Sequence, residues 1–230
     1  MLKGLIIKDL YSVRFQIIAG FFIMLLPNIE LMLASFNGLE DGIINTTVES
    51  LTLRLGLCAA VSFVNIVLFS SFVLNAISDD ISSGWNKIQR TFPLSGSNIV
   101  GAKLIATYII IGILTLTSVC FNIGTGLIHG YDMEFFIACP VCIGLMQITL
   151  VSPLFPLSLK FGAKGTNVLY LAAEILSIIG VVILVMADFD LSDPPTAFRL
   201  EFYLGLPALA ALSAVISYFS GNAAVRKITE

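Results

Sequence analysis

Residues 78–103 read SDDISSGWNKIQRTFPLSGSNIVGAK and form a long polar interval between two apolar runs. The flanking runs, at about 56–77 and 104–128, each have about the 20 residues that a helix needs to span a bilayer. The interval carries the single Trp of the chain, an acidic pair and three basic residues, namely Trp85, Asp79, Asp80, Lys87, Arg90 and Lys103. This pattern predicts a charged loop at one membrane face, between two spanning helices.

The composition of the whole chain is that of a membrane protein. Of its 230 residues, 57% are hydrophobic and 12% are charged, and the mean hydropathy is +0.99. Soluble domains usually carry about 25% charged residues, so this chain lacks the polar surface that water requires. The intervals outside the apolar runs are too short for a separate soluble domain. We therefore expect residues 1–230 to form a single transmembrane domain.

Six apolar runs predict six transmembrane helices and an all-α integral membrane fold. The runs lie at about 17–36, 56–77, 104–128, 135–157, 167–187 and 203–223. Ahead of them, residues 1–16 have apolar side chains at helical spacing, which is typical of an amphipathic helix in the membrane interface. The fourth run contains Pro140, Pro153 and Pro156, which can break its helix into pieces.

The basic residues predict the orientation of the chain. In a six-span arrangement one membrane side receives ten of the 12 Lys and Arg residues, namely Lys3, Lys8, Arg14, Lys87, Arg90, Lys103, Lys160, Lys164, Arg226 and Lys227. Only Arg54 and Arg199 fall on the other side. Because cytoplasmic loops collect Lys and Arg, we expect both termini to be cytoplasmic in a multi-pass protein of the cell membrane.

Two carboxylates fall inside predicted spans, Glu30 in the first and Glu174 in the fifth. Such residues are rare and usually face a bundle interior or a water-filled cavity. One interpretation is that they line a pathway or contact a cationic substrate. The other is that each is protonated or hydrogen-bonded to a neighbouring helix. The amides in the spans are expected to join helices rather than to bind a ligand; they are Asn65, Asn75, Asn122 and Gln147.

The sequence shows no pattern that indicates catalysis. The fragment at 162–166 lacks the spacing of a phosphate-binding loop. Cys139 and Cys142 have CxxC spacing, but a structural zinc site needs four ligands and the chain has one His, His129. We therefore expect no enzyme, no catalytic residue, no metal, no cofactor bound by this chain and no nucleic-acid partner.

The interval after the second span has the features of a short amphipathic helix. Ser78 can cap it, and Asp79 and Asp80 in its first turn are favourable toward the helix dipole. Its apolar stripe consists of Ile77, Ile81, Trp85 and Ile88. Such a helix can dock in a groove of another protein. The alternative is a solvated loop that rests on lipid headgroups.

Two regions of the chain resemble the small six-span permease subunits of type-2 ABC exporters in bacteria. One is Leu5-Ile-Ile-Lys8-Asp9-Leu10, leading through Arg14 into the first span. The other comprises the segments Asp80 through Gly84-Trp85, Phe92-Pro93-Leu-Ser95, and Val100 with Lys103. The chain is most similar to compact permeases that pair with a separate ATPase and export antimicrobial or amphipathic cytolytic peptides.

The resemblance implies a dimer of permeases, of one kind or two, with two ABC ATPase subunits that bind ATP and Mg. It implies that the segment after span two is a coupling helix, in which the ATPase-docking residues are Asp79, Asp80, Ile81, Trp85, Lys87, Ile88 and Arg90. Spans one, two and five of such permeases commonly border the dimer interface or the translocation path, which would bring Glu30 and Glu174 near it. The expected function is ATP-driven export of amphipathic or hydrophobic peptides, drugs or lipids.

Two other classes of protein stay open from the sequence. One is a membrane protein that works without ATP, either a small carrier or an immunity protein against a peptide toxin. The other is a membrane-embedded enzyme, which would need a polar cluster at one membrane face.

Overall fold

The computed structural model of the protein is helical. It describes residues 2–15, 18, 21, 22, 25, 29, 58–67, 70, 80, 95–129, 133–158, 161, 165, 168–175 and 196–229, and these ranges contain no strand. The named helices are α1 (Leu2–Ser12), α5 (Gly96–His129), α6 (Met133–Val151) and α8 (Thr196–Thr229). Residues 58–67 and 168–175 are also helical. The predicted all-α fold class is thus confirmed for this part of the chain.

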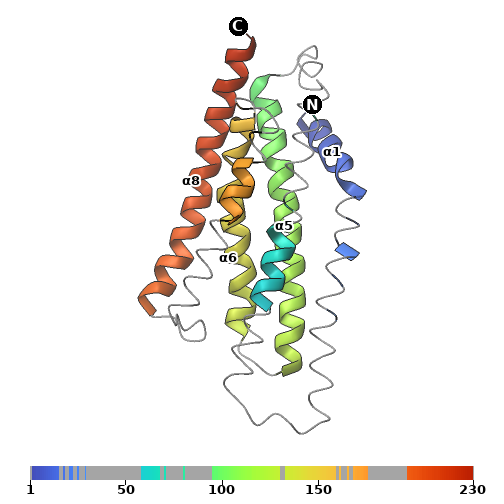
Figure 1. Ribbon diagram of the computed structural model, residues 1–230, viewed down its shortest axis with the longest axis vertical. Helices are drawn as coiled ribbons and strands as arrows, with labels where there is room; N and C mark the ends of the chain where they lie inside the picture. Colours follow the sequence, from blue (N-terminus) through green and yellow to red (C-terminus); the bar gives the residue numbers. More distant parts are fainter. Residues whose placement is uncertain are drawn as a thin grey trace.

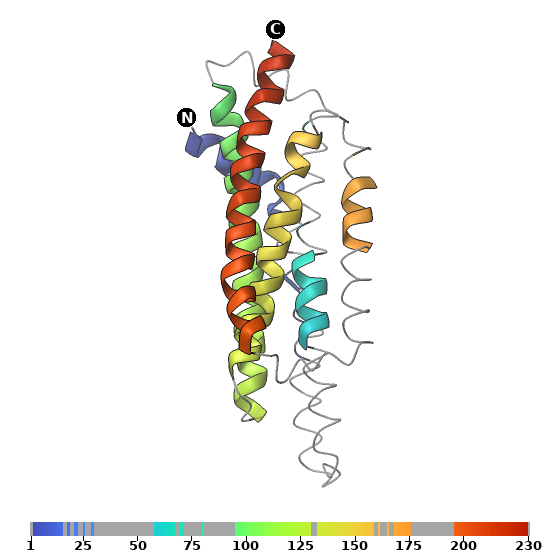
Figure 2. The same cartoon turned by 90° about the vertical axis from the view of Figure 1, so that its left-hand side faces the viewer.

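The long helices α5, α6 and α8 run side by side along the longest axis of the molecule (Figure 1). α5 runs opposite to α6 and α8. The shorter α1 lies across the bundle beside the first turns of α5, as the second view shows (Figure 2). Both chain termini and the start of α5 therefore lie at the same end of the bundle.

Within the described residues, three helical segments are long and apolar enough to cross a membrane. They are Gly96–Leu127, Met133–Ser158 and Leu204–Val225, which correspond to the predicted third, fourth and sixth spans. The shorter apolar helix Cys58–Val67 falls within the second predicted run, and helical residues 168–175 fall within the fifth. The count of six spans and the cytoplasmic placement of the termini stay predictions.

The prolines of the fourth run interrupt its helix at one point. Pro140 lies inside α6 without ending it, whereas Ser152 and Pro153 form a turn before helix resumes at 154–158. Pro153 has no N–H to donate to the carbonyl of Thr149 one turn earlier. The hydroxyl of Ser213 on α8 donates to that carbonyl instead, at 2.9 Å. Such replacement partners are what a spanning helix needs, because lipid offers no hydrogen bonds.

Small residues allow the helices to approach closely. At Gly144 of α6, an added Cβ would overlap the Thr115 hydroxyl of α5. At Gly221 of α8, it would lie 2.9 Å from Val100, a fully buried residue of α5. Lipid tails are as apolar as the side chains, so helices in a bilayer associate through such packing and through interhelical hydrogen bonds. α5 is thus closely packed against both α6 and α8.

The outer faces of the helices are apolar. On α8, Leu204, Leu212 and Phe219 are each more than half exposed. A soluble monomer rarely shows a large contiguous surface of this kind. The faces fit contact with lipid, as the composition predicts.

Gly144→Ala should destabilise the protein, because the new methyl group overlaps Thr115 and the helices must separate. We expect a loss of about 1–3 kcal/mol, the usual effect of overpacking. Thermal unfolding in detergent measures it. The matched control is Gly112→Ala on α5, where nothing lies within 4 Å of the added Cβ. Equal stability of the two variants would contradict the close packing of α5 and α6.

Candidate functional site

The sequence-predicted site residues are only partly covered by the structure. Of the coupling-helix residues, Asp80 is described, and Glu174 is described among the intramembrane carboxylates. The other expected residues lie outside the described part of the chain, namely Asp79, Ile81, Trp85, Lys87, Ile88, Arg90 and Glu30. Their roles stay predictions. The described residues form two polar clusters at different depths of the bundle.

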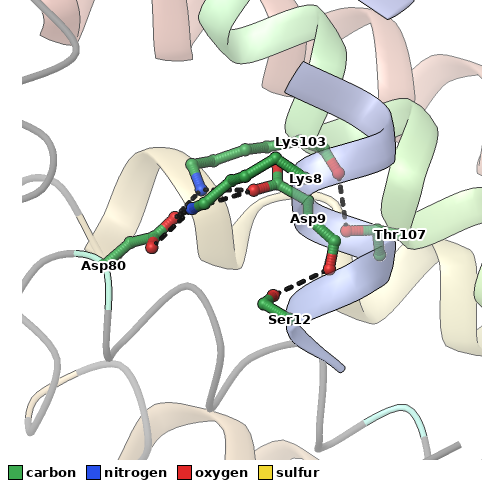
Figure 3. A network of polar contacts seen from close by, with 6 residues as sticks. All are labelled: Lys8, Asp9, Ser12, Asp80, Lys103 and Thr107. Carbon is green, nitrogen blue, oxygen red and sulfur yellow. Dashed lines mark hydrogen bonds and ion pairs between the residues drawn. The ribbon is translucent and has the colours of Figure 1, made fainter. Parts of the chain in front are cut away.

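The first cluster lies at the end of the bundle that holds both termini. We call Lys8, Asp9, Asp80 and Lys103 the four-charge cluster (Figure 3). The Lys8 ammonium donates to both carboxylate oxygens of Asp80 at 2.8 Å. Lys103 donates to Asp80 Oδ2 at 2.5 Å and lies 3.7 Å from Asp9 Oδ1. Lys8 also lies 3.2 Å from Asp9 Oδ1, so both ammonium groups face both carboxylates.

The members of the four-charge cluster differ in burial. The Lys103 side chain is 4% exposed and those of Asp9 and Asp80 about 15%, whereas that of Lys8 is 33% exposed. Two positive and two negative charges give no net charge. A buried ammonium is tolerated only when it is paired and hydrogen-bonded, and the two carboxylates supply this for Lys103. Lys103 is therefore the member that depends most on the others.

Local structure positions each member of the four-charge cluster. Lys8 and Asp9 are neighbours on α1, while Lys103 lies about two turns into α5. The start of α5 is capped by Ser95, whose hydroxyl accepts from the Asn98 N–H at 3.3 Å. Asp80 is helical and approaches from the interval before α5 (Figure 3). The cluster thus joins three segments of the chain.

The second cluster lies in the middle of the bundle, and we call Ser70, Gln147, Tyr170 and Glu174 the Gln147 network. The amide nitrogen of Gln147 lies 2.5 Å from Ser70 Oγ, 2.9 Å from the Tyr170 hydroxyl and 3.0 Å from Glu174 Oε1. It has two hydrogens, so it donates to two of these oxygens at a time. The hydroxyls of Ser70 and Tyr170 both donate to the carbonyl of Val67.

All four members of the Gln147 network are buried, and none is more than 8% exposed. Gln147 lies near the middle of the Met133–Ser158 candidate span. Glu174 uses one carboxyl oxygen for Gln147, while its Oε2 is buried without a hydrogen-bond partner in the described residues. The network therefore joins three helical segments and offers one further acceptor atom deep in the bundle.

A third polar contact is simpler. The side chain of Asn122 on α5 donates to Ser62 Oγ at 3.1 Å, and both residues are buried. Asn122 and Gln147 thus join helices, as the sequence predicts. In the described ranges, no group of three or more His, Cys, Asp or Glu side chains is placed to hold a metal ion.

The comparison with protein families decides the class of this molecule. A family model described as ABC-2 family transporter protein matches residues 4–221, which is nearly the whole chain. The chain belongs to the ABC-2 transporter family. Searches among curated proteins and among solved structures found no match. As a member, this ABC-2 protein is the membrane component of an ABC transporter and associates with an ABC ATPase.

Sequence reasoning missed the four-charge cluster of this ABC-2 protein. It placed Asp80 at the start of a docking helix and left Lys8, Asp9 and Lys103 without partners. The pairs of Asp80 join residues 72 and 23 positions apart, which no helical spacing reveals. A signal was nevertheless present, because all four residues lie in the two regions that carry the family resemblance.

Gln147→Leu should destabilise the ABC-2 protein with little change in side-chain volume. The substitution leaves the carboxyl group of Glu174 without the donor that the described residues provide. We expect a loss of about 1–3 kcal/mol, the usual penalty for an unsatisfied buried polar group. Thermal unfolding in detergent measures it.

Thr117→Val is the control for Gln147→Leu. The Thr117 hydroxyl donates to the Ile113 carbonyl one turn earlier in the same helix, at 2.9 Å, so its removal breaks a local bond. We expect a change within about 0.5 kcal/mol. If Gln147→Leu were no worse than this control, the Gln147 network would not hold the helices together.

Proposed function

We propose that this chain is the permease subunit of an ATP-driven exporter that moves amphipathic or hydrophobic substrates out of the cell. The observation that carries the proposal is the ABC-2 family match over residues 4–221. The candidate substrates are amphipathic peptides, hydrophobic drugs and lipids. The composition of the chain, which is 57% hydrophobic, supports this class, because sugars and inorganic ions need a path lined by polar groups.

In this proposal the energy comes from a separate ATPase subunit. Two permeases pair in the cell membrane with their termini in the cytoplasm, and two ATPases lie beneath them. ATP and Mg bind to the ATPases, whose closure moves the coupling helices and turns the permeases from inward-open to outward-open. Trp85 and Ile88 are the docking side chains on each coupling helix. Asp80 contacts Lys8 on α1, which lies at the end of the bundle with both termini, and this contact supports a docking segment there.

The substrate path in this proposal passes Glu30 and Glu174. The support comes from Glu174, whose buried Oε2 has no hydrogen-bond partner in the described residues. A carboxylate inside a bilayer is strongly disfavoured unless a positive group or a donor compensates it. A cationic group of an amphipathic peptide has the chemistry to do so. Glu174 would therefore favour cationic over neutral substrates.

Docking is tested with Trp85→Ala and Ile88→Asp. Both variants should insert normally, but each removes apolar docking surface, so less ATPase should co-purify with the tagged permease from the native host in mild detergent. Loss of a central apolar anchor typically costs about 2 kcal/mol or more of binding free energy, which lowers the affinity for the ATPase at least about tenfold. Gln89→Ala, off the apolar stripe of the same segment, is the control.

A wild-type permease that came out alone in the docking experiment would contradict the exporter proposal itself. Wild-type levels of ATPase with both docking variants would instead contradict only the assignment of Trp85 and Ile88.

The role of Glu174 is tested with Glu174→Gln in inside-out vesicles that contain the complete transporter. Uptake of a labelled cationic amphipathic peptide should fall about tenfold or more, since loss of a buried charge pair usually removes over 1.4 kcal/mol. Uptake of a neutral hydrophobic dye should change little. Glu134→Gln is the matched control, because Glu134 is exposed at the start of α6. Unchanged peptide uptake, at every pH tested, would assign Glu174 a structural role.

A further inference from the structure

The four-charge cluster connects the interval before α5 with two helices at once. Asp80 lies in the segment that the proposed function assigns to ATPase docking. Its carboxylate accepts hydrogen bonds from Lys8 on α1 and from Lys103 on α5. Figure 3 shows both ammonium groups converging on this carboxylate from their helices. These two contacts of Asp80 are directed toward α1 and α5 of the permease.

Burial makes the link to α5 stronger than the link to α1. Lys103 is 4% exposed, so water cannot replace Asp80 as its partner without a change in packing. If Asp80 moved away alone, Asp9 at 3.7 Å would be the remaining carboxylate near Lys103 in the described residues. Lys8 is 33% exposed and can exchange its partner for water. Separation of Asp80 from α5 is thus the costlier of the two movements.

The start of α5 is itself tightly packed. Val100 and Leu104, on either side of Lys103, belong to the main hydrophobic core. Val100 faces Gly221 of α8, where no room exists for a larger residue. Close-packed elements move as bodies rather than by continuous deformation. A displacement of Lys103 is therefore passed on to α5 and to its neighbour.

We propose that the four-charge cluster makes Asp80, α1 and the start of α5 one mechanical unit, so that ATPase movement against the coupling segment shifts both helices. This inference rests on the proposed function and adds a role to it. Asp80 is a positioning residue inside the permease and not an ATPase contact. The docking side chains are those on the apolar stripe of the segment, and Asp80 transmits their movement.

The test uses the purified complex of the permease with its partner ATPase in lipid nanodiscs. ATPase binding is measured by co-purification. Transmission is measured by hydrogen–deuterium exchange, as the change at residues 2–12 and 96–104 when ATP and vanadate trap the ATPase. Lys103→Met should keep ATPase binding but reduce the trapped-state change by about fivefold or more, the lower range of typical coupling between sites.

Three further variants separate transmission from general stability. Lys103→Arg keeps the buried charge and should keep most of the trapped-state change. Lys8→Met removes the same charge from a partly exposed position and should have a smaller effect than Lys103→Met. Asp80→Asn removes the link to Lys103 and also the link to Lys8, so its loss of the trapped-state change should be at least that of Lys103→Met. The double variant should be no worse than Asp80→Asn alone, because Asp80→Asn already removes the pair with Lys103. If Lys103→Met failed to insert, Lys103→Gln and Asp80→Asn would provide the same comparison.

Specific outcomes would overturn the inference. A normal trapped-state change in Lys103→Met and Asp80→Asn would show that the cluster transmits nothing. Loss of ATPase binding in Asp80→Asn with normal binding in Lys103→Met would make Asp80 an ATPase contact. Absence of ATPase from the wild-type preparation would overturn the proposed function, and this inference with it. If the wild-type complex assembles with its ATPase and the variants keep the wild-type trapped-state change, this inference alone is overturned.

Discussion

The buried ammonium group of Lys103 is the constraint on which the described end of the bundle depends. A charge that is 4% exposed must have a counter-charge, and the chain brings Asp80 and Asp9 to it from two other segments. α1, Asp80 and α5 consequently meet at one point. The same point lies next to the core residues Val100 and Leu104, so that charge pairing and close packing constrain the same turns of α5.

α5 is the helix that the rest of the described structure uses as a support. α1 lies against its first turns, Ser62 bonds to Asn122 in its second half, and Gly144 of α6 contacts Thr115 at its middle. The Ser62 contact is polar, and the contact at Gly144 is made possible by a missing side chain, while Val100 and Leu104 of α5 pack in the main hydrophobic core. In a bilayer this is the expected chemistry, because apolar surface alone gives no preference for a helix over lipid.

The two polar clusters differ in their depth in the bundle and in whether each polar group has a hydrogen-bond partner among the described residues. The charged groups of the four-charge cluster are paired with one another, at the end of the bundle where α1 and the start of α5 lie. The Gln147 network lies deeper and leaves Glu174 Oε2 unpaired among the described residues. A satisfied cluster suits a mechanical link, and an unsatisfied carboxyl oxygen suits a group that meets a substrate. The proposed exporter uses the first to receive movement and the second to select cargo.

Sequence alone determined the membrane class, the helical fold of the described residues, the three candidate spans at 96–127, 133–158 and 204–225, and the ABC-2 resemblance. These follow from hydrophobicity over about 20 consecutive residues and from short motifs, which are local properties of the chain. It also identified Gln147 and Asn122 as residues that join helices. Tertiary structure decided which residues Gln147 and Asn122 bond to. It also decided that Pro140 stays inside α6, and that the Ser213 hydroxyl donates to the Thr149 carbonyl, for which Pro153 has no N–H. It alone brought Asp80 to Lys8 and Lys103, because pairing across 72 and 23 residues depends on how helices pack and leaves no periodic trace in the sequence.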